Sequence, residues 1–335
     1  MPGSLTDVDG LLVGHHQRLG RGWRTGTTAI IAPAGAVAGV DVRGGGPGTR
    51  ETDLLAPQAM IERIHGICLT GGSAYGLAAA DGVMRWLEEQ HIGFPVLGGQ
   101  QPEWVVPIVP AAVIFDLGRG GTFGNRPDAG FGHRAAAAAR RSPERVGAVG
   151  AGTGARAGGL QGGVGSASRR LADGTTVAAL AVVNAVGQVI DPSTALPWHL
   201  GDLRLKRPTR AERQALAEHV ATVIPPLNTT IGIVATDAAL TKAECTKLAA
   251  VAHDGLARAI RPAHLMFDGD TIFGLSTERR PLLADGAPSR PSALNALLIA
   301  AADCFAEACT SAVVNACSSP GCAPSYRDLC PTAFA

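Results

Sequence analysis

The stretch Asn228-Thr229-Thr230-Ile231-Gly232-Ile233-Val234-Ala235 joins a polar start to a run of apolar residues. Such a run is typical of a buried strand, so the two threonines lie where the strand begins. A hydroxyl residue there, directly after Asn, suggests a peptide bond that the protein cuts by itself. Cleavage would make Thr229 a new N-terminus, with a hydroxyl nucleophile and an α-amine of pKa about 8 as base. A plain structural interpretation also exists, because Asn-x-Thr sequons and Thr-rich strand starts are common.

The composition is that of a compact, heavily buried protein. A chain of 335 residues can form one large domain or two ordinary ones. Hydrophobic residues make up 46% and charged residues 17%, which excludes a largely disordered chain. The formal net charge of +1 gives no electrostatic basis for binding nucleic acid or an anionic membrane. We therefore expect neither nucleic acid nor membrane among its partners.

The N-terminal residues and the cysteines bear on location. The start, MPGSLTDVDGLLVGHH, lacks a basic segment followed by an apolar one, so no export signal is expected. Polar residues interrupt every long apolar run, which predicts no membrane-spanning segment and, by default, a cytoplasmic protein. The seven cysteines lack the CxxC pairs of a structural zinc site, and without export a disulfide framework is not expected. We interpret all seven as structural thiols.

Strand and helix signals alternate along the chain, without an internal repeat or a flexible linker. A hairpin is predicted from two apolar runs, 27–31 and 37–42, around a turn at 33–35. Further strands are predicted at 67–70, 105–115 (one edge strand or two short ones), 177–183 with a hairpin return at 188–191, 231–235 and 271–275. Helices are predicted at 52–64, 73–89, from 133 onward, at 209–221 with a proline stop at 224–227, at 241–260 and at 292–316. This pattern favours a single α+β domain over 1–335, a layered sandwich with helices outside the sheets, rather than a doubly wound parallel fold.

Several familiar motifs are absent or incomplete. Gly150 to Ala155 fits a loose GxGxxA fingerprint, but no clear strand leads into it and no acidic strand end follows. His15 and His16 are adjacent, and adjacent side chains of an extended segment point to opposite sides, which disfavours a metal site. Ser73 lies outside any GxSxG elbow and is interpreted as a helix N-cap. We therefore expect no cofactor and no metal.

Four polar residues remain that could serve chemistry together. Asn184 ends a predicted strand and Tyr75 lies at a glycine-flanked turn, where an amide or a phenol can stabilise an oxyanion. Asp268 and Asp270 come just before an apolar strand, where carboxylates could hold a new Thr229 ammonium and orient its hydroxyl. Taken singly, each fits a structural role: a capped turn, a half-buried aromatic or an Asp-Gly-Asp loop. Only their combination points to a site.

Seven segments together resemble one family over nearly the whole chain, the self-cleaving L-aminopeptidase/D-esterases. These enzymes are also called β-aminopeptidases and include a nylon-oligomer hydrolase. The segments are Thr25-Gly26-Thr27-Thr28, Gly39-Val40-Asp41-Val42-Arg43-Gly44-Gly45, Leu69-Thr70-Gly71-Gly72-Ser73-Ala74-Tyr75-Gly76-Leu77, Gly150-Ala151-Gly152-Thr153-Gly154, Val183-Asn184-Ala185-Val186-Gly187, Asn228 to Thr236 and Asp268-Gly269-Asp270-Thr271-Ile272-Phe273.

The resemblance implies a four-layer αββα sandwich of the N-terminal-nucleophile type. It further implies a precursor that cuts itself between Asn228 and Thr229, giving a large chain 1–228 and a small chain 229–335. The processed subunits of this family commonly form homo-oligomers, often tetramers. By the same likeness Thr229 is the catalytic nucleophile and the Asn228–Thr229 bond is the cleavage site.

The other site residues carry over position by position. Asn184 and Tyr75 fall where the family places oxyanion contacts, and Asp268 and Asp270 match its acidic or hydroxyl pair near the nucleophile. One departure stands out, because relatives often carry a lysine near the site in a Gly-Lys pair. Here Gly159 falls where that lysine would be, and an arginine such as Arg156 does not replace a lysine as a proton shuttle.

The expected function is hydrolysis of amide or ester bonds in small amino-acyl substrates, built on D-, L- or β-amino acids, through an acyl-enzyme. Two alternatives stay open. One is a threonine-dependent acyltransferase of the ornithine acetyltransferase type, which would also cleave itself but pass the acyl group to an amine. The other is a non-catalytic, uncleaved scaffold of the same fold.

Overall fold

The structure is a computed structural model that describes residues 3–222, 228–282 and 289–335. The proline stop expected at 224–227 lies outside the described residues. The helices are α1 (Ala79–Glu89), α2 (Ala129–Ala137), α3 (Arg210–Ala221), α4 (Lys242–Ala259), α5 (Arg290–Val314) and α6 (Tyr326–Leu329), with short 3-10 turns that include η2 (Asp53–Leu55) and η3 (Ser73–Ala78). The strands are β1 (Leu12–Gly20), β2 (Trp23–Val42), β3 (Thr49–Arg50), β4 (Arg63–Thr70), β5 (Phe94–Pro95), β6 (Val105–Val106), β7 (Ala111–Val113), β8 (Arg156–Ala157), β9 (Leu160–Gln161), β10 (Gly163–Arg170), β11 (Thr176–Asn184), β12 (Thr229–Ala238) and β13 (Thr271–Arg280).

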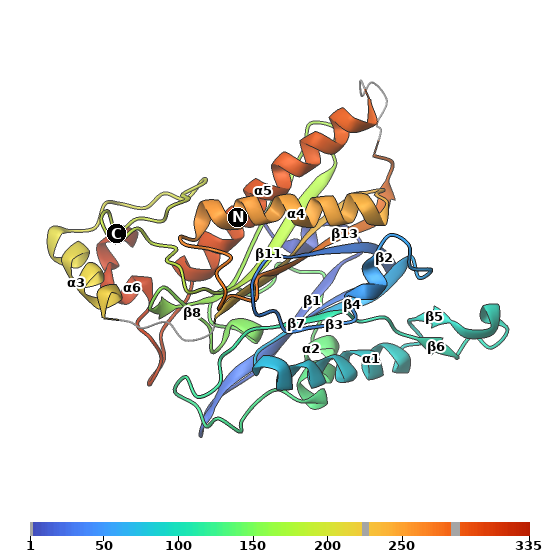
Figure 1. Cartoon of the computed structure of the whole chain (residues 1–335), viewed down its shortest axis with the longest axis horizontal. Coiled ribbons are helices and arrows are strands. Elements are labelled where there is room, and N and C mark those ends of the chain that lie inside the picture. The colour runs from blue at the N-terminus through green and yellow to red at the C-terminus, as the bar shows by residue number, and fades with distance from the viewer. Residues whose placement is uncertain (1–2, 223–227, 283–288) are drawn as a thin grey trace.

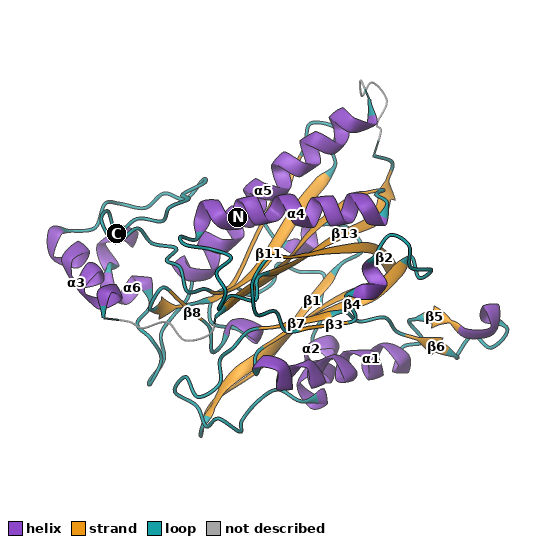
Figure 2. Ribbon diagram, in the orientation of Figure 1, coloured by secondary structure: helices purple, strands orange, loops and turns teal. Residues whose placement is uncertain are grey.

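The longest strand, β2, links two sheet layers. Residues 23–31 of β2 pair with β1 on one side. On the other side, residues 27–31 and 36–37 pair with β4, which is followed by β7 and β3. Residues 37–42 pair with β13, and the sheet continues through β12 and β11 to β10. Helices α4 and α5 cover the outer face of this second layer, and α1 and α2 cover the outer face of the first (Figures 1 and 2). The order of layers is therefore helix, sheet, sheet, helix.

Side-chain alternation along β11 shows why the layers stack in this way. Val177, Ala179, Ala181 and Val183 belong to the core shared with α4 and α5. The intervening residues of β11 face the other sheet and meet side chains of β2 and β4 in a second core. Both faces of the strand are apolar, so both must be covered. A third core lies between α1, α2 and the outer face of β2 and β4. The αββα sandwich expected from the sequence is confirmed.

The hairpin predicted at 27–42 is wrong, because β2 runs straight through the expected turn. Its pairing register with β4 shifts between Ile31 and Ala36, which marks an irregularity in the strand instead of a reversal. Pro33 lacks an N–H group and is tolerated because it lies exposed at this irregularity. The reversal comes earlier, at Arg21 and Gly22, both with positive φ, and joins β2 to β1.

Other expected elements shift or disappear. The helix predicted at 52–64 reduces to η2, and β4 begins already at Arg63 because β2 offers it a pairing edge. The hairpin return expected at 188–191 does not form, since β11 pairs instead with the preceding strand β10 and with β12. The segment 105–115 contains two short strands, β6 and β7. The capping boxes at Thr209 and Thr241 are present at the starts of α3 and α4, as predicted.

Helix α5 is long and apolar enough to cross a membrane by length and composition, which the sequence analysis did not anticipate. Of its most apolar stretch, 83% is buried inside the protein, as in the core helix of a soluble domain. It packs on β10, β11 and α4.

Five cysteines are also buried, and burial raises the pKa of Cys68 and of Cys304 to about 12, which fits structural thiols.

Candidate active site

Thr229 is the first residue of β12 and pairs in register with Asn184, the last residue of β11. Its side chain is buried, with only 6% of the residue exposed. The Thr229 hydroxyl donates to the carbonyl oxygen of Asn228 at 2.5 Å. The hydroxyl thus lies against the carbonyl of the peptide bond that precedes it.

Gly269 lets a second backbone segment approach this hydroxyl. A Cβ atom at Gly269 would lie 2.8 Å from Thr229 Oγ1 and 2.7 Å from the carbonyl oxygen of Gly46. Both distances are shorter than carbon and oxygen atoms tolerate without displacement, so only glycine fits. The Asp268–Asp270 loop is thereby held against the start of β12.

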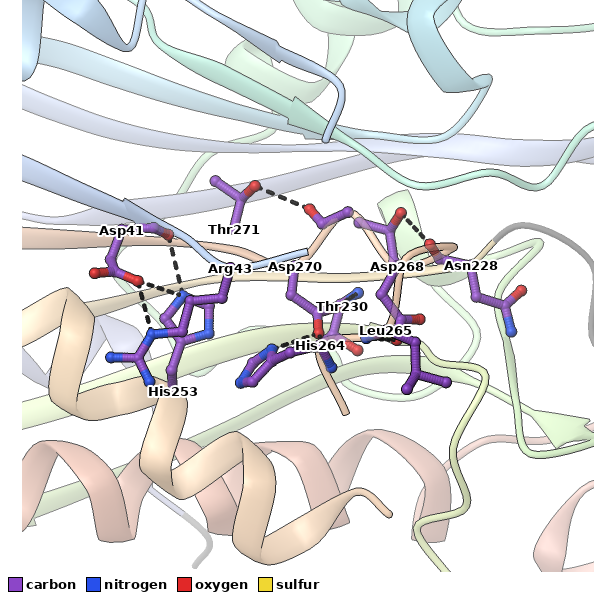
Figure 3. A network of polar contacts seen from close by, with 12 residues as sticks. Asp41, Arg43, Asn228, Thr230, His253, His264, Leu265, Asp268, Asp270 and Thr271 are labelled. Carbon is purple, nitrogen blue, oxygen red and sulfur yellow. Dashed lines mark hydrogen bonds and ion pairs between the residues drawn. The ribbon is translucent and has the colours of Figure 1, made fainter. Parts of the chain in front are cut away.

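Asp270 fastens this loop to β12 (Figure 3). Its Oδ1 accepts a hydrogen bond from the backbone N–H of Thr230 at 2.7 Å. Its Oδ2 accepts from His264 twice, from the backbone N–H at 3.1 Å and from the ring Nδ1 at 2.8 Å. His264 was not singled out in the sequence, because an isolated histidine in a loop carries no motif.

Asp268 is buried on the other side of Gly269. Its carboxylate accepts from the backbone N–H of Leu265 at 2.9 Å. Burial raises the pKa of Asp268, and the nearby charge of Asp270 raises it further. Phe267, which directly precedes Asp268, contacts the expected cleavage site, because its carbonyl oxygen accepts a hydrogen bond from the Asn228 N–H at 3.2 Å. Both carboxylates therefore belong to the short loop that contacts Asn228, Thr229 and Thr230.

Asn184 is fully buried, and its hydrogen bonds fix how its amide is oriented. The side-chain oxygen accepts from the Arg119 guanidinium and, at 3.0 Å, from the backbone N–H of Arg156. The side-chain nitrogen donates to the Phe115 carbonyl at 3.3 Å. Because guanidinium and N–H groups only donate, the oxygen must face them. The amide nitrogen, which carries a second hydrogen, is the group available to an oxyanion.

Arg119 is the main residue that the sequence analysis missed. One of its terminal nitrogens donates to Asn184 and the other to the side-chain oxygen of Asn228. Burial lowers the pKa of Arg119 to about 10, and the charge of Arg156 lowers it as well, so the guanidinium still carries its charge at neutral pH. A single charged residue inside the glycine-rich loop 118–121 was the only sequence signal for it.

Tyr75 does not join the residues gathered around the Asn228–Thr229 bond. Tyr75 is 55% exposed, and its ring lies 3.6 Å from the Arg126 guanidinium carbon, measured to the ring centroid. A hollow of about 140 Å³ opens at Thr229 and is lined by Asn228, Phe115, Phe267, Val113, Ser73, Ala74 and Gly46 to Gly48. The two residues that precede Tyr75 thus reach the hollow. Ser73 is not the expected N-cap: Gly72 holds that position, and Ser73 is the first residue of η3.

The turn between β8 and β9 explains glycine at 159. Gly158 and Gly159 both have positive φ, 55° and 92°, and form the two-residue loop of the β8–β9 hairpin. Such loops favour glycine, and a lysine in this conformation would be strained. The Gly159 carbonyl also accepts a hydrogen bond from the ring of His219 at 3.1 Å.

In the part of the chain that the structure describes, no group of three or more His, Cys, Asp or Glu residues could hold a metal ion.

Comparison with known proteins identifies the family of this chain. The model of peptidase family S58 matches residues 3–325. The chain belongs to peptidase family S58. This S58 protein is 50% identical to an uncharacterized aminopeptidase of Mycobacterium tuberculosis, with 99% of both chains covered. It is 32% identical to the 6-aminohexanoate-oligomer endohydrolase of Paenarthrobacter ureafaciens, over 79% of this chain and 73% of that one.

Solved structures show the same fold. A Burkholderia sp. beta-aminopeptidase superposes with a TM-score of 0.72 and 26% identity, covering 100% of this chain and 94% of the other. The L-aminopeptidase D-Ala-esterase/amidase of Ochrobactrum anthropi, described as a variant of the Ntn hydrolase fold, has a TM-score of 0.72 and 22% identity. The match covers 98% of this chain and 93% of the Ochrobactrum anthropi chain. The protein is therefore a hydrolase of the aminopeptidase or amidase type with an Ntn-hydrolase fold.

Proposed function

We propose that this S58 protein cuts its own Asn228–Thr229 bond and then acts as an N-terminal-threonine aminopeptidase or amidase. The observation that carries the proposal is the 2.5 Å contact between the Thr229 hydroxyl and the Asn228 carbonyl oxygen, at the start of a buried strand. A nucleophile so close to an acyl group loses little entropy on the way to attack.

Self-cleavage proceeds in two steps. Thr229 Oγ adds to the Asn228 carbonyl carbon and gives up its proton, the C–N bond breaks, and the Thr229 nitrogen takes a proton to become a free amine. The product is an ester between Asn228 and the Thr229 hydroxyl. Water then hydrolyses the ester, leaving a carboxylate on Asn228 and a free hydroxyl on Thr229.

The mature enzyme repeats this chemistry on a substrate. The α-amine of Thr229 takes the hydroxyl proton, Oγ attacks the substrate amide or ester, and water hydrolyses the acyl-enzyme. The Asn184 amide nitrogen stabilises the oxyanion, and Asp268 and Asp270 hold the new N-terminus. The substrates are small amides with a free amino group. The names of the relatives, an aminopeptidase and a 6-aminohexanoate-oligomer endohydrolase, support this class.

Replacing Thr229 tests the proposal directly. Thr229→Ala removes the nucleophile, so the purified protein should remain one chain of 34.1 kDa and hydrolyse no amide. Thr229→Ser keeps a hydroxyl and should still be cut. The measurement is mass spectrometry under denaturing conditions, combined with an amidase assay on an amino-acid 4-nitroanilide.

Thr230→Val provides the matched control. The Thr230 hydroxyl makes no hydrogen bond within the described residues, and valine has nearly the same shape. Thr230→Val should therefore be processed like the wild type. Two chains from Thr229→Ala, or one intact chain from Thr230→Val, would place the nucleophile at Thr230 instead.

A further inference from the structure

The ring of His264 lies between the Asp268–Asp270 loop and helix α4. Its Nδ1 is 2.8 Å from Asp270 Oδ2, and the ring meets that of His253, on α4, edge to face with the two centroids 4.9 Å apart (Figure 3). Burial lowers the pKa of His253 to about 4, so this second ring is uncharged at neutral pH. His253 therefore supports the His264 ring by packing, and Asp270 is the polar partner of that ring.

Both oxygens of the Asp270 carboxylate accept from backbone N–H groups. Oδ1 accepts from Thr230, the second residue of β12, and Oδ2 accepts from His264. Because the carboxylate acts as an acceptor, the ring nitrogen Nδ1 donates to it and carries the ring hydrogen. With two donors on Oδ2, the carboxylate cannot rotate without breaking hydrogen bonds, and Oδ1 stays on the start of β12.

Backbone hydrogen bonds, and not the ring, hold the loop itself in place. The Asp270 carbonyl accepts from the Arg43 N–H at 2.9 Å, and the Asp268 carbonyl accepts from the Gly46 N–H at 2.8 Å. The Asp268 N–H also donates to the Leu265 carbonyl at 3.0 Å. The ring therefore adds direction to one carboxylate, and such direction matters because small displacements near a nucleophile slow its attack strongly.

We propose that His264 is a positioning residue, which aims the Asp270 carboxylate at the start of β12 in the uncut chain and in the mature enzyme. This inference rests on the proposed function. In the uncut chain, the bond from Thr230 fixes the peptide unit that follows Thr229, and with it the hydroxyl beside the Asn228 carbonyl. After the cut, the same fixed carboxylate helps to hold the new Thr229 ammonium.

The backbone at His264 decides which variants are informative. Its φ is 60°, in the left-handed region, which asparagine and glycine adopt more readily than most other residues. Both variants also keep the backbone N–H that donates to Asp270 Oδ2. Only His264→Asn keeps a side-chain N–H bonded to Cγ, as Nδ1 is in histidine. His264→Asn and His264→Gly therefore differ in the donor that the proposal requires.

Self-cleavage of chains made by cell-free synthesis tests the proposal, followed over time by mass spectrometry under denaturing conditions. We expect His264→Asn to cut within about threefold of the wild-type rate and His264→Gly to cut about 10- to 100-fold more slowly. His133→Ala, which removes a hydrogen bond to Glu89, is the control and should cut at the wild-type rate. Equal rates for the two His264 variants would overturn the role of His264 while leaving the proposed function intact. A wild type that stays one chain would overturn both.

Kinetics of the processed enzymes separate positioning from substrate binding. On an amino-acid 4-nitroanilide, His264→Gly should lower kcat and leave KM unchanged, because His264 touches the carboxylate and not the substrate. A raised KM with unchanged kcat would contradict the proposal. If His264→Gly does not fold, nitrogen NMR on wild-type protein with labelled histidine decides, with the His264 signal assigned by its loss in His264→Asn. A hydrogen on Nδ1 supports the proposal, and a hydrogen on Nε2 alone overturns it.

Discussion

Among single residues, Asp116 shows how burial at the site shapes pH dependence. Its carboxyl is fully buried beside Arg119 and accepts from the Gly72 N–H at 2.7 Å. Burial raises the pKa of Asp116 from 3.8 to about 6, because desolvation outweighs the hydrogen bonds and the charge of Arg119. The folded state therefore holds this proton more tightly than the unfolded state. Its contribution to stability is full below pH 3.8 and is lost as the pH rises to about 6.

Asp116→Asn should remove this dependence while keeping the acceptor for Gly72. The difference in free energy of unfolding, variant minus wild type, should increase by about 2 to 3 kcal/mol when the pH is raised from 4 to 8. Denaturant unfolding of both proteins at the two pH values provides the measurement. If the difference in free energy of unfolding between the two proteins is the same at pH 4 and at pH 8, burial does not raise the pKa of Asp116.

At the scale of elements, α4 and α5 touch through backbone at Gly255. A Cβ atom there would lie 2.0 Å from the carbonyl oxygen of Ala302 on α5. A backbone atom in the middle of a helix cannot move aside cheaply, so the helices would have to separate.

Gly255→Ala is therefore expected to lower the free energy of unfolding by about 1 to 3 kcal/mol, although alanine favours a helix more than glycine does. Gly124→Ala is the control, since nothing lies within 4 Å of its added Cβ, and its effect should stay within about 0.5 kcal/mol. Thermal or denaturant unfolding measures both. An unchanged or raised stability for Gly255→Ala would mean that helix propensity outweighs the contact.

At the scale of the whole molecule, the proposed cut divides the chain without dividing the fold. The segment 229–335 contains β12, α4, β13 and α5. On one side β12 pairs with β11, and on the other β13 pairs with β2, both from 1–228. The small chain would thus keep its two strands in the middle of a sheet and its helices over a shared core.

We expect the two processed chains to stay associated. Light scattering under native conditions should give the same mass for the wild type and for Thr229→Ala. Under denaturing conditions the wild type should separate into chains of about 23 and 11 kDa, taking the average residue mass of a 34.1 kDa chain of 335 residues. Loss of the small chain during native chromatography would contradict this prediction.

The sequence by itself determined the local features. The apolar run after Thr229 predicted β12, and the capping boxes at Thr209 and Thr241 predicted the starts of α3 and α4, because these signals depend on residues a few positions apart. The Asp268–Asp270 loop was recognised for the same reason, since its carboxylates stand beside an apolar strand in the chain.

Only the tertiary structure decided what long-range pairing controls. It made β2 one continuous strand through Pro33, since β4 pairs with it on both sides of this residue and β13 pairs with its residues 37–42 in the same nine-stranded sheet. It left Tyr75 exposed, and it brought Arg119 to Asn228 across 109 positions of sequence. No periodicity or spacing records such a contact, because it arises only when the sheets and loops assemble.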